Sequence, residues 1–332
     1  MSSKPEGRVF LRGIVSKKYG LDELRRSTLD APRVRGEKVV TDDGSIAHSG
    51  DSEHSSTYWR LGPGDDPFLT QTLQVHFVDM EPHSANAGHG HQNEAMFYII
   101  EGYGHEIHDE QRHEWKQGDV VTVHTDSVHR HYNDSDQKAH CLVIKAKSLW
   151  MYLGLIQQGK IGSFSDPDDR YGPREDWSQI WTDGVGELKK IVTPSETPLE
   201  HDGVAPVRRL TGPGRDDVRC FSVDTYQYEV EPGGRSSRYW MMADEVFYVV
   251  SGRGTSVHWE VGADIDERFH ARVAKEPTHH EIEQGDVLWV PQNTVRQHIN
   301  SSEDEPLVLL GTRNSMFRHL GYDRTHILEP GR

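Results

Sequence analysis

Short segments rich in Val, Ile, Phe and Tyr recur along the chain, separated by Gly, Asn and Asp. In the first half they lie around His76 and over residues 96–101, 119–124 and 141–145. A second series covers residues 221–230, 245–251, 255–260, 286–291 and 307–312. Runs of this length between turn residues are typical of β-strands. The pattern therefore predicts an all-β protein.

The two series of strands are copies of one unit. The run Ala-Met-Phe-Tyr-Ile-Ile-Glu-Gly at 95–102 matches Glu-Val-Phe-Tyr-Val-Val-Ser-Gly at 245–252, with an offset of 150. A later Gly-Asp pair and an Asn match with an offset of 167, so the second copy holds 17 additional residues, which we expect to form a charged loop near 263–280. Two copies of a β unit with glycine turns predict two small barrels or sandwiches.

Polar segments flank and separate the two predicted barrels. Residues 1–70 form an arm with one candidate amphipathic helix, Val15–Leu29, and we expect the arm to wrap a neighbouring barrel. Apolar residues at helical spacing predict a helix over 148–159, followed by a linker rich in Asp, Pro and Gly. The predicted organisation is an arm over 1–70, a first barrel over 71–147, a helical and linker segment over 148–219, and a second barrel over 220–332.

Composition limits the classes of partner. The chain has 53 acidic and 37 basic residues and a formal charge of −16, which argues against nucleic acid or an anionic membrane as the main partner. No apolar run of about 18 residues and no secretory signal is recognisable, so we expect a cytoplasmic location. The only cysteines, Cys141 and Cys220, lie in predicted strands, and we expect both to be core residues.

Histidine is concentrated in the first copy, since ten of the 21 histidines fall between residues 83 and 140. His89 and His91 are two apart, so in a strand both imidazoles face the same side. His129 and His131 have the same relation on a separate segment that an antiparallel barrel can bring across the cavity. The pattern therefore predicts a metal site on His89, His91 and one histidine of the second segment. Imidazole ligands with open positions suit Fe(II), although Mn, Ni and Zn also accept imidazole.

Residues 89–102 and 118–133 resemble the two sequence motifs of the cupin family. The resemblance covers roughly residues 70–145 and, more loosely, 220–312, and it implies two antiparallel barrels or jelly rolls, with a metal inside the first on His89, His91 and His129. Together with the helices predicted from apolar spacing, the expected fold is all-β, with two such barrels and short helices at the N-terminus and between the barrels. Where many cupins have a ligating glutamate, four residues after His91, this chain has Ala95. Glu94 has the opposite parity and would reach the metal only through a bulge.

The second copy lacks the same ligands. Tyr239 and Met241 stand where the HxH pair would be, and Arg296 stands where the third histidine would be. Glu245 and His298 remain at the equivalents of Ala95 and His131, but two separated groups make a poor site. We expect no metal there and interpret this copy as a structural or dimerising barrel.

Three histidines without a glutamate in the first barrel make the chain similar to the gentisate, salicylate and 1-hydroxy-2-naphthoate dioxygenases. That resemblance implies Fe(II), a hydroxylated aromatic acid bound through two oxygens, dioxygen and ring cleavage. His131 matches a second family histidine, which would hydrogen-bond substrate or dioxygen and move a proton. A histidine that only packs inside the barrel is the alternative.

One family feature is absent, because the arginine that usually follows the second ligand by six residues and grips the substrate carboxylate is Phe97 here. Phe97 shares the parity of the ligands. It either lines the pocket, which would suit a phenol, catechol or quinol without a carboxylate, or belongs to the core. Arg112 and Arg130 could supply the missing charge, but the first lies in a predicted turn and the second has outward parity.

The leading hypothesis is an Fe(II) ring-cleaving dioxygenase whose partners are a small aromatic substrate and dioxygen. A diketone or thiol dioxygenase, an isomerase or decarboxylase with Mn or Zn, and a non-catalytic binding protein are the alternatives. The resemblance also implies a homodimer or homotetramer. We assign the other histidines of the first copy without a motif role to the surface or to turns: His83, His105, His108, His113 and His124.

Overall fold

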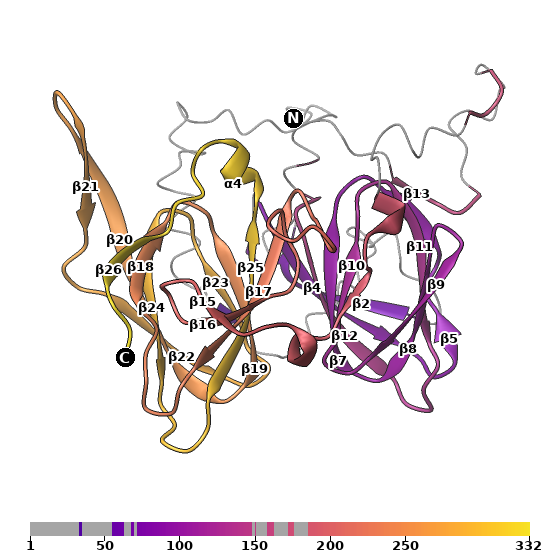
Figure 1. Ribbon diagram of the computed structural model, residues 1–332, viewed down its shortest axis with the longest axis horizontal. Helices are drawn as coiled ribbons and strands as arrows, with labels where there is room; N and C mark the ends of the chain where they lie inside the picture. The colour runs from indigo at the N-terminus through magenta and orange to yellow at the C-terminus, as the bar shows by residue number, and fades with distance from the viewer. Residues whose placement is uncertain are drawn as a thin grey trace, which may run out of the picture.

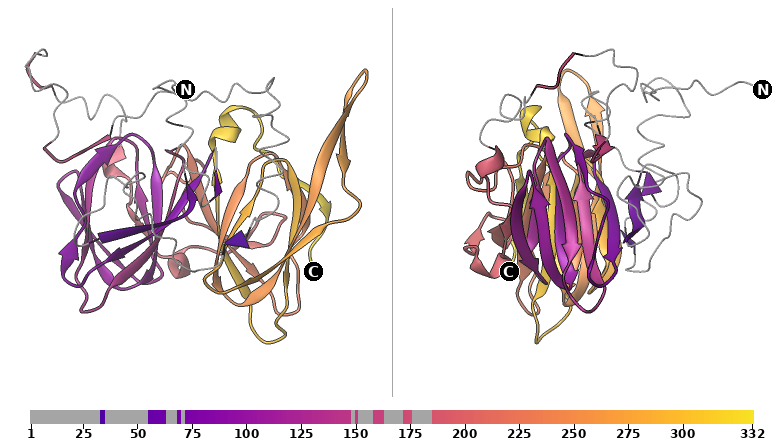
Figure 2. Two further views of the ribbon diagram at one scale, coloured as in Figure 1. Left: turned by 180° about the vertical axis from the view of Figure 1, so that it is seen from behind. Right: turned by 90° about the vertical axis from the view of Figure 1, so that its right-hand side faces the viewer.

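Two barrels lie side by side in the computed structural model, the first in purple and the second in orange and yellow (Figure 1). The structure describes residues 33–34, 55–62, 68–69, 72–147, 150, 158–162, 172–175 and 185–332. Each barrel consists of two facing sheets, and in the end-on view of Figure 2 the first barrel lies in front of the second. The prediction of an all-β chain with two barrels is confirmed.

The first barrel has a seven-stranded and a six-stranded sheet. The seven strands, in spatial order, are β14 (Ile191–Val192), β10 (Val120–Val123), β7 (Ala95–Glu101), β12 (Ala139–Lys145), β4 (Gln74–Met80), β2 (Ser55–Gly62) and β3 (Phe68–Leu69). The facing sheet has β13 (Gln158–Lys160), β6 (His89–His91), β11 (Ser127–Asn133), β8 (Tyr103–His108) and β9 (Gln111–Lys116), with β5 (Ser84–Ala85) on β11. Among the described strands of this barrel, only β2 and β3 pair in parallel.

The second barrel repeats this plan. Its larger sheet has β1 (Arg33–Val34), β23 (Val287–Val290), β19 (Glu245–Ser251), β25 (Leu307–Asn314), β17 (Val223–Val230), β16 (Pro206–Arg209) and β15 (Glu200–His201). The facing sheet has β21 (Phe269–Val273), β20 (Arg253–Ile265), β24 (Thr294–Asn300), β18 (Arg238–Met241) and β26 (His326–Glu329), with β22 (Thr278–Glu283) on β20. The helical elements bounded within the described residues are α4 (Met316–His319), η2 (Val185–Glu187) and η3 (Pro194–Glu196).

The strands predicted from the hydrophobic runs are confirmed, but two connecting segments differ from expectation. The charged insertion of the second copy is not a loop, because β20 and β21 pair from Val261 to Val273 as a hairpin that projects from the barrel. The predicted end of the 148–159 helix is wrong, since Gln158–Lys160 satisfies its backbone groups by pairing with the open edge of β6. Most of that helix and the Val15–Leu29 helix lie outside the described residues.

The arm contributes to both barrels. Arg33–Val34 pairs with β23 of the second barrel, as the wrapping prediction requires. Ser55–Gly62 pairs with β4 and so extends the sheet of the first barrel. The arm therefore adds backbone hydrogen bonds at the edge of each larger sheet.

The larger sheets of the two barrels pack against each other through a shared apolar core. Tyr98 lies across from its equivalent Tyr248, with ring centroids 5.8 Å apart, and Phe77 meets the same tyrosine at 6.3 Å. Cys141 and Cys220 are buried and form no disulfide, which confirms their assignment to the core. One face of each larger sheet thus joins the barrels, and the other face lines its own barrel.

Glycines mark the equivalent turns of the two copies. Gly102 and Gly252 have φ angles of +97° and +86°, which side chains with a Cβ rarely adopt. A Cβ at Gly102 would lie 3.0 Å from Ala139, and one at Gly252 would lie 2.6 Å from the carbonyl oxygen of Pro306. Both turns therefore require glycine, for conformation and for space.

No helix among the described residues has the length and apolar character needed to cross a lipid bilayer.

Candidate metal centre

The three predicted ligands come from two paired strands of the smaller sheet in the first barrel. In the pairing of β6 with β11, His89 lies opposite His129 and His91 lies opposite Ser127. Burial alternates along both strands, with the histidines buried and Gly90 and Arg130 only half-buried. The outward parity predicted for Arg130 is thus what the structure shows, and the imidazoles point into the barrel.

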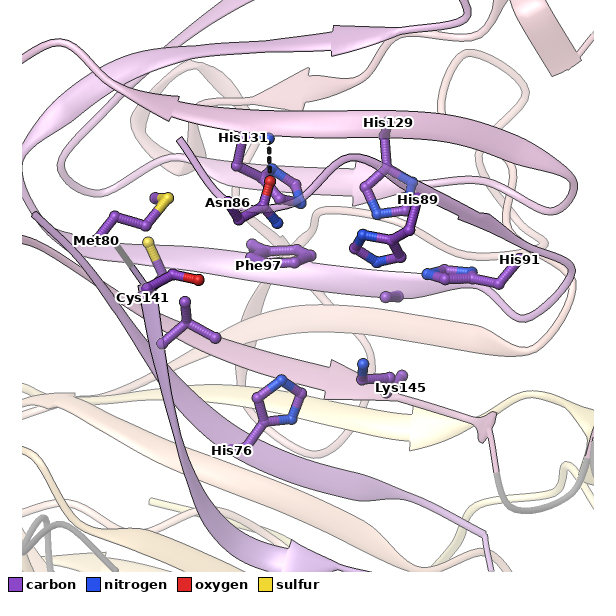
Figure 3. A pocket seen from close by; sticks show the side chains of 13 residues that line it. His76, Met80, Asn86, His89, His91, Phe97, His129, His131, Cys141 and Lys145 are labelled. Carbon is purple, nitrogen blue, oxygen red and sulfur yellow. Dashed lines mark hydrogen bonds between the residues drawn. The ribbon is translucent and has the colours of Figure 1, made fainter. Parts of the chain in front are cut away.

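The imidazoles of His89, His91 and His129 converge (Figure 3). One nitrogen from each ring lies within 4.8 Å of the other two. The ring centroids are 4.4 Å apart for His89 and His129, 4.9 Å for His91 and His129, and 5.3 Å for the HxH pair. This geometry brings three nitrogen donors around one point, which a single ion can occupy.

Hydrogen bonds to main-chain carbonyls orient two of the three rings. Nδ1 of His89 lies 3.0 Å from the carbonyl oxygen of Ala87, and Nδ1 of His129 lies 3.4 Å from that of Ser127. A carbonyl only accepts, so Nδ1 carries the proton and Nε2 keeps the lone pair that a metal needs. The ring orientation therefore fits metal binding.

Burial keeps these imidazoles neutral. Desolvation, opposed by the hydrogen bond to Ala87 and assisted by Lys145, lowers the pKa of His89 to about 4. Desolvation is also the main cause that holds the pKa values of His91 and His129 well below the ordinary value. At neutral pH all three offer lone pairs, so the donor set fits a divalent ion, and the described residues add no carboxylate to this set of donors.

The two predicted substrate-binding residues lie beside this group. Phe97 and His131 both line the pocket that the three histidines line, and their ring centroids are 4.2 Å apart. The pocket encloses about 480 Å³ that protein atoms do not fill, part of it open to solvent. The structure therefore places Phe97 in the pocket wall, as its parity predicts, and Phe97 also packs against the apolar core of the first barrel.

Glu94 is turned away from the metal group. Its carboxylate accepts hydrogen bonds from the backbone N–H of Phe221 at 2.7 Å and from the N–H and hydroxyl of Ser222. These partners directly precede β17 of the second barrel. The Glu94 side chain points to them and away from the pocket, so no bulge brings it to the metal group. Ala95 lines the pocket instead.

Sequence reasoning missed a buried carboxylate next to the site. Glu106 on β8 lies 3.1 Å from Nδ1 of His131 and 3.1 Å from Nε2 of His108. Burial alone would raise the pKa of Glu106, but the two imidazoles outweigh it and lower the pKa to about 2. The carboxylate is therefore anionic and fixes the ring of His131. The alternation of residues along 103–108 was the signal available in the sequence, but it predicts the position of Glu106 only when the register of β8 on β11 is also known.

The assignment of the other histidines to the surface is wrong for three of them. His105, His108 and His124 are buried, because their strands face the interior or a neighbouring segment. His105 pairs with Asp134 at 2.6 Å, and His124 lies 3.2 Å from the ammonium group of Lys190. None of these three belongs to the group of metal donors that the described residues form.

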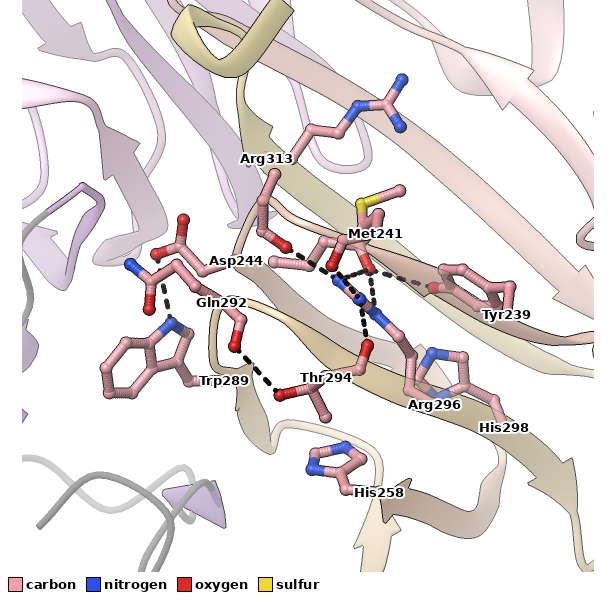
Figure 4. Close-up of polar contacts among 12 residues, drawn as sticks. Tyr239, Met241, Asp244, His258, Trp289, Gln292, Thr294, Arg296, His298 and Arg313 are labelled. Carbon is pink, nitrogen blue, oxygen red and sulfur yellow. Dashed lines mark hydrogen bonds and ion pairs between the residues drawn. The ribbon is translucent and has the colours of Figure 1, made fainter. Parts of the chain in front are cut away.

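The second barrel fills the equivalent space with an ion pair (Figure 4). The guanidinium of Arg296 lies 2.7 Å from the carboxylate of Glu245 and donates to the carbonyl oxygens of Met241, Thr294 and Ala243. The Tyr239 hydroxyl donates to the same carboxylate at 3.0 Å. A cation of the chain itself therefore occupies the position of the third histidine.

Comparison with known proteins agrees with the fold. Residues 76–145 match the family description "Cupin domain", and residues 216–318 match "Cupin". No curated protein matches the sequence.

Solved structures with the same fold differ widely in what they are. Salicylate 1,2-dioxygenase from Pseudaminobacter salicylatoxidans is 16% identical over 80% of this chain and 78% of its own, with a TM-score of 0.57. A mutant of Bacillus subtilis oxalate decarboxylase is 15% identical over 89% and 80%, with a TM-score of 0.56. The coconut allergen cocosin is 14% identical over 81% and 84%, with a TM-score of 0.57. At these identities the likeness to solved structures shows the fold alone. The two family matches together cover more than half of the chain, so the chain belongs to the cupins, with two cupin domains in one polypeptide.

Proposed function

We propose that the first barrel is the active centre of a metal-dependent oxygenase, with Fe(II) on His89, His91 and His129, that cleaves the ring of a small hydroxylated aromatic compound. The observation that carries the proposal is the convergence of three buried, neutral imidazoles beside a pocket with an aromatic wall. Mn(II) is the second candidate metal, and Ni(II) and Zn(II) accept the same donors.

The protein's own groups divide the work around the ion. A bound Fe(II) would supply open coordination positions and the redox chemistry that dioxygen requires. Phe97 gives a flat apolar surface for an aromatic ring. His131 faces the pocket, and its Nε2 has no partner among the described residues, so it is placed to hydrogen-bond a substrate oxygen and move a proton.

Glu106 and Asn86 act as positioning residues for His131. The Glu106 carboxylate holds Nδ1 of the ring, which leaves Nε2 directed at the pocket. The side-chain oxygen of Asn86 accepts the backbone N–H of His131 at 3.0 Å and so fixes the strand. A rigid imidazole is needed because proton transfer depends on a short, aligned contact.

A decarboxylase is the second candidate function, supported by the likeness to oxalate decarboxylase over 89% of the chain. It would use the same three imidazoles with Mn(II), and its turnover would release carbon dioxide from a carboxylic acid. A diketone or thiol dioxygenase would consume dioxygen without an aromatic substrate. A binding protein would keep its ligand after the metal is removed.

The test is metal content and dioxygen uptake after anaerobic loading with Fe(II) or Mn(II). A panel of phenols, catechols and hydroxylated benzoates serves as substrate, with His129→Ala as the variant and His298→Ala as the matched control. The control removes a buried histidine at the position equivalent to His131 in the second barrel. About one iron per chain, with uptake that only His129→Ala abolishes, supports the proposal. Metal without uptake favours the decarboxylase or another redox-silent enzyme, and absence of bound metal rejects the site.

A further inference from the structure

The insertion of the second barrel forms a hairpin that closing the barrel does not require. In the first barrel, β8 and β9 are joined by two residues, Asp109 and Glu110, which both have positive φ angles. At the equivalent place in the second barrel, β20 continues and pairs with β21 before β22 begins at Thr278. The β20–β21 hairpin projects beyond the barrel in both side views (Figures 1 and 2). A two-residue turn is thus sufficient for this connection, and the hairpin is an addition to the barrel.

One face of the hairpin carries only apolar side chains. Residues two apart along a strand share a face, and residues directly opposite in an antiparallel pair share it as well. Three cross-strand pairs lie on this face: Val261 with Val273, Ala263 with Ala271, and Ile265 with Phe269. The other face carries Gly262, Asp264, His270 and Arg272. The hairpin is therefore amphipathic along its whole length.

The apolar face is exposed at its outer end. Ile265 and Phe269 are 75% and 72% exposed, which makes them the two most exposed large hydrophobic side chains of the described residues. Their cross-strand contact stabilises the hairpin by about 0.2–1 kcal/mol, but a two-stranded hairpin alone is at best marginally stable in water. Exposed apolar faces of this kind are typical of surfaces that another molecule covers. The apolar face therefore indicates a contact surface.

The charge of the hairpin favours a second copy of this chain as the partner. Each copy has a formal charge of −16, so two copies repel each other over most of their surface. Residues 261–275, however, hold three acidic and three basic residues. On the polar face, Arg272 lies 3.1 Å from Asp264, and His270 lies 3.2 Å from Asp266. The hairpin therefore has no excess charge that would repel its counterpart, and no excess positive charge that would attract a nucleic acid or an anionic membrane.

The sizes of the side chains also fit a second copy of the same face. The apolar pairs are large at the tip, small in the middle and intermediate at the base, where Val273 is 42% exposed. About a two-fold axis at the level of Ala263, this alanine would lie over its own counterpart, and Phe269 would lie over Val273 of the second copy. The small alanines in the middle allow the two sheets to approach closely. Two-fold contacts that use the same patch on both subunits are the commonest kind in homo-oligomers.

We propose that the apolar face of the β20–β21 hairpin is a dimerisation surface, on which the same face of a second copy packs about a two-fold axis. Each copy contributes one hairpin face, which is smaller than the roughly 20–30 residues per partner of a stable interface. The dimer should therefore dissociate reversibly, with a dissociation constant of about 1–100 µM. This inference goes beyond the proposed function and does not depend on a metal in the first barrel.

The test measures the mass of the full chain by sedimentation at concentrations from about 1 to 300 µM. Wild-type protein should shift from monomer to dimer over this range. Ile265→Thr/Phe269→Thr removes the exposed apolar pair but keeps a residue type that favours strands, so the dissociation constant should rise by about tenfold or more. Asp264→Thr/His270→Thr is the matched control, because it changes the neighbouring cross-strand pair on the opposite face. This control should dimerise as the wild type does.

A new cysteine locates the contact in chains that keep the apolar pair. The protein's own cysteines, Cys141 and Cys220, are buried and do not interfere. Under mild oxidation, Ala263→Cys should give a covalent dimer, because the two-fold axis brings this position close to its counterpart, and a disulfide requires Cβ atoms about 3.5–4.5 Å apart. Asp264→Cys, which lies on the opposite face, should stay unlinked.

Three results would overturn the proposal. The first is wild-type protein that stays monomeric at every concentration, in which case the hairpin faces a different partner. The second is a dimer that Ile265→Thr/Phe269→Thr leaves intact, and the third is cross-linking through Asp264→Cys in place of Ala263→Cys. His129→Ala should dimerise normally, so failure of the proposed metal function and failure of this inference are distinguishable.

Discussion

The two barrels have equivalent strands and turns and pack against each other, but the polar groups in their interiors differ. The first places His89, His91 and His129 around a point where a metal cation fits. The second places Arg296 there and surrounds it with Glu245 and main-chain carbonyls. The first barrel thus offers neutral donors that can hold a cation, whereas the second holds a cation of its own side chains at the equivalent position.

A second difference lies on β8 of the first barrel and on its equivalent in the second barrel, β20. Glu106 in the first barrel bridges His108 and His131, and the second barrel has Ser256 between His258 and His298. The Ser256 hydroxyl lies 2.9 Å from Nε2 of His258 and 3.1 Å from Nδ1 of His298. Both bridges are buried, but only the first holds a histidine beside the metal group with an anionic partner.

The largest expected effect comes from converting the first barrel into the second. The double variant Ala95→Glu/His129→Arg reproduces the internal ion pair, and bound metal should fall from about one ion per chain to almost none because the guanidinium occupies the ion's position. Elemental analysis after loading measures this. His129→Arg alone buries an unpaired charge, so it should unfold more easily than the double variant. Metal retention in the double variant would refute the equivalence of the two sites.

Breaking the ion pair of the second barrel should cost the next largest free energy. Glu245→Gln removes the charge that faces Arg296 and should lower the free energy of unfolding by about 3–5 kcal/mol, since an uncompensated buried charge remains. Urea unfolding followed by tryptophan fluorescence measures the loss. Glu245→Gln/Arg296→Met should lose less, and metal binding in the first barrel should be unchanged in both. Equal stability of the single variant and wild type would contradict this role for the pair.

Much of this comparison is visible in the sequence, and the rest depends on register. Period-two alternation was sufficient to place His89 and His91 on one face and Glu94 on the other, but it left open a bulge that would turn Glu94 toward the metal, and only the structure excludes that. The alternation did not show which face of β12 carries Lys145, because nearly every residue of β12 is buried and the strand has no polar face. The partners of Glu94 lie 127 and 128 residues away, and only the packing of two barrels brings them together.

Replacing Glu106, the anionic bridge of the first barrel, should affect activity more than replacing Ser256, the neutral bridge of the second. Glu106→Gln keeps the size of the side chain but loses the charge that fixes His131, so kcat should fall about 10- to 100-fold, the usual loss for residues that orient site groups. KM and metal content should change little. Ser256→Ala in the second barrel is the matched control and should leave kcat unchanged. Equal effects of the two substitutions would mean that both bridges serve only folding.

The smallest expected effect concerns the contact between the barrels. There a carboxylate of each barrel accepts a hydrogen bond from a hydroxyl of the other barrel, at equivalent positions in the two copies. Glu94 accepts from two backbone N–H groups and the hydroxyl of Ser222, whereas Asp244 accepts from the hydroxyl of Thr72 and from Trp289. Ser222→Ala leaves two donors on Glu94 and should cost about 1 kcal/mol of unfolding free energy.

Thr72→Val removes one of the two side-chain donors to a fully buried carboxylate, so it should cost more, about 1–3 kcal/mol. Desolvation raises the pKa of Asp244 to about 6, and loss of a donor to the charged form raises it further. Because this pKa lies above the unfolded value, the folded state binds more protons between pH 4 and 6, and stability from this group falls as pH rises. The deficit of Thr72→Val relative to wild type should therefore grow from pH 4 to pH 7 in urea unfolding, while that of Thr72→Val/Asp244→Asn should not. A deficit independent of pH would show that the threonine contributes by packing instead of by its hydrogen bond to the charged carboxylate.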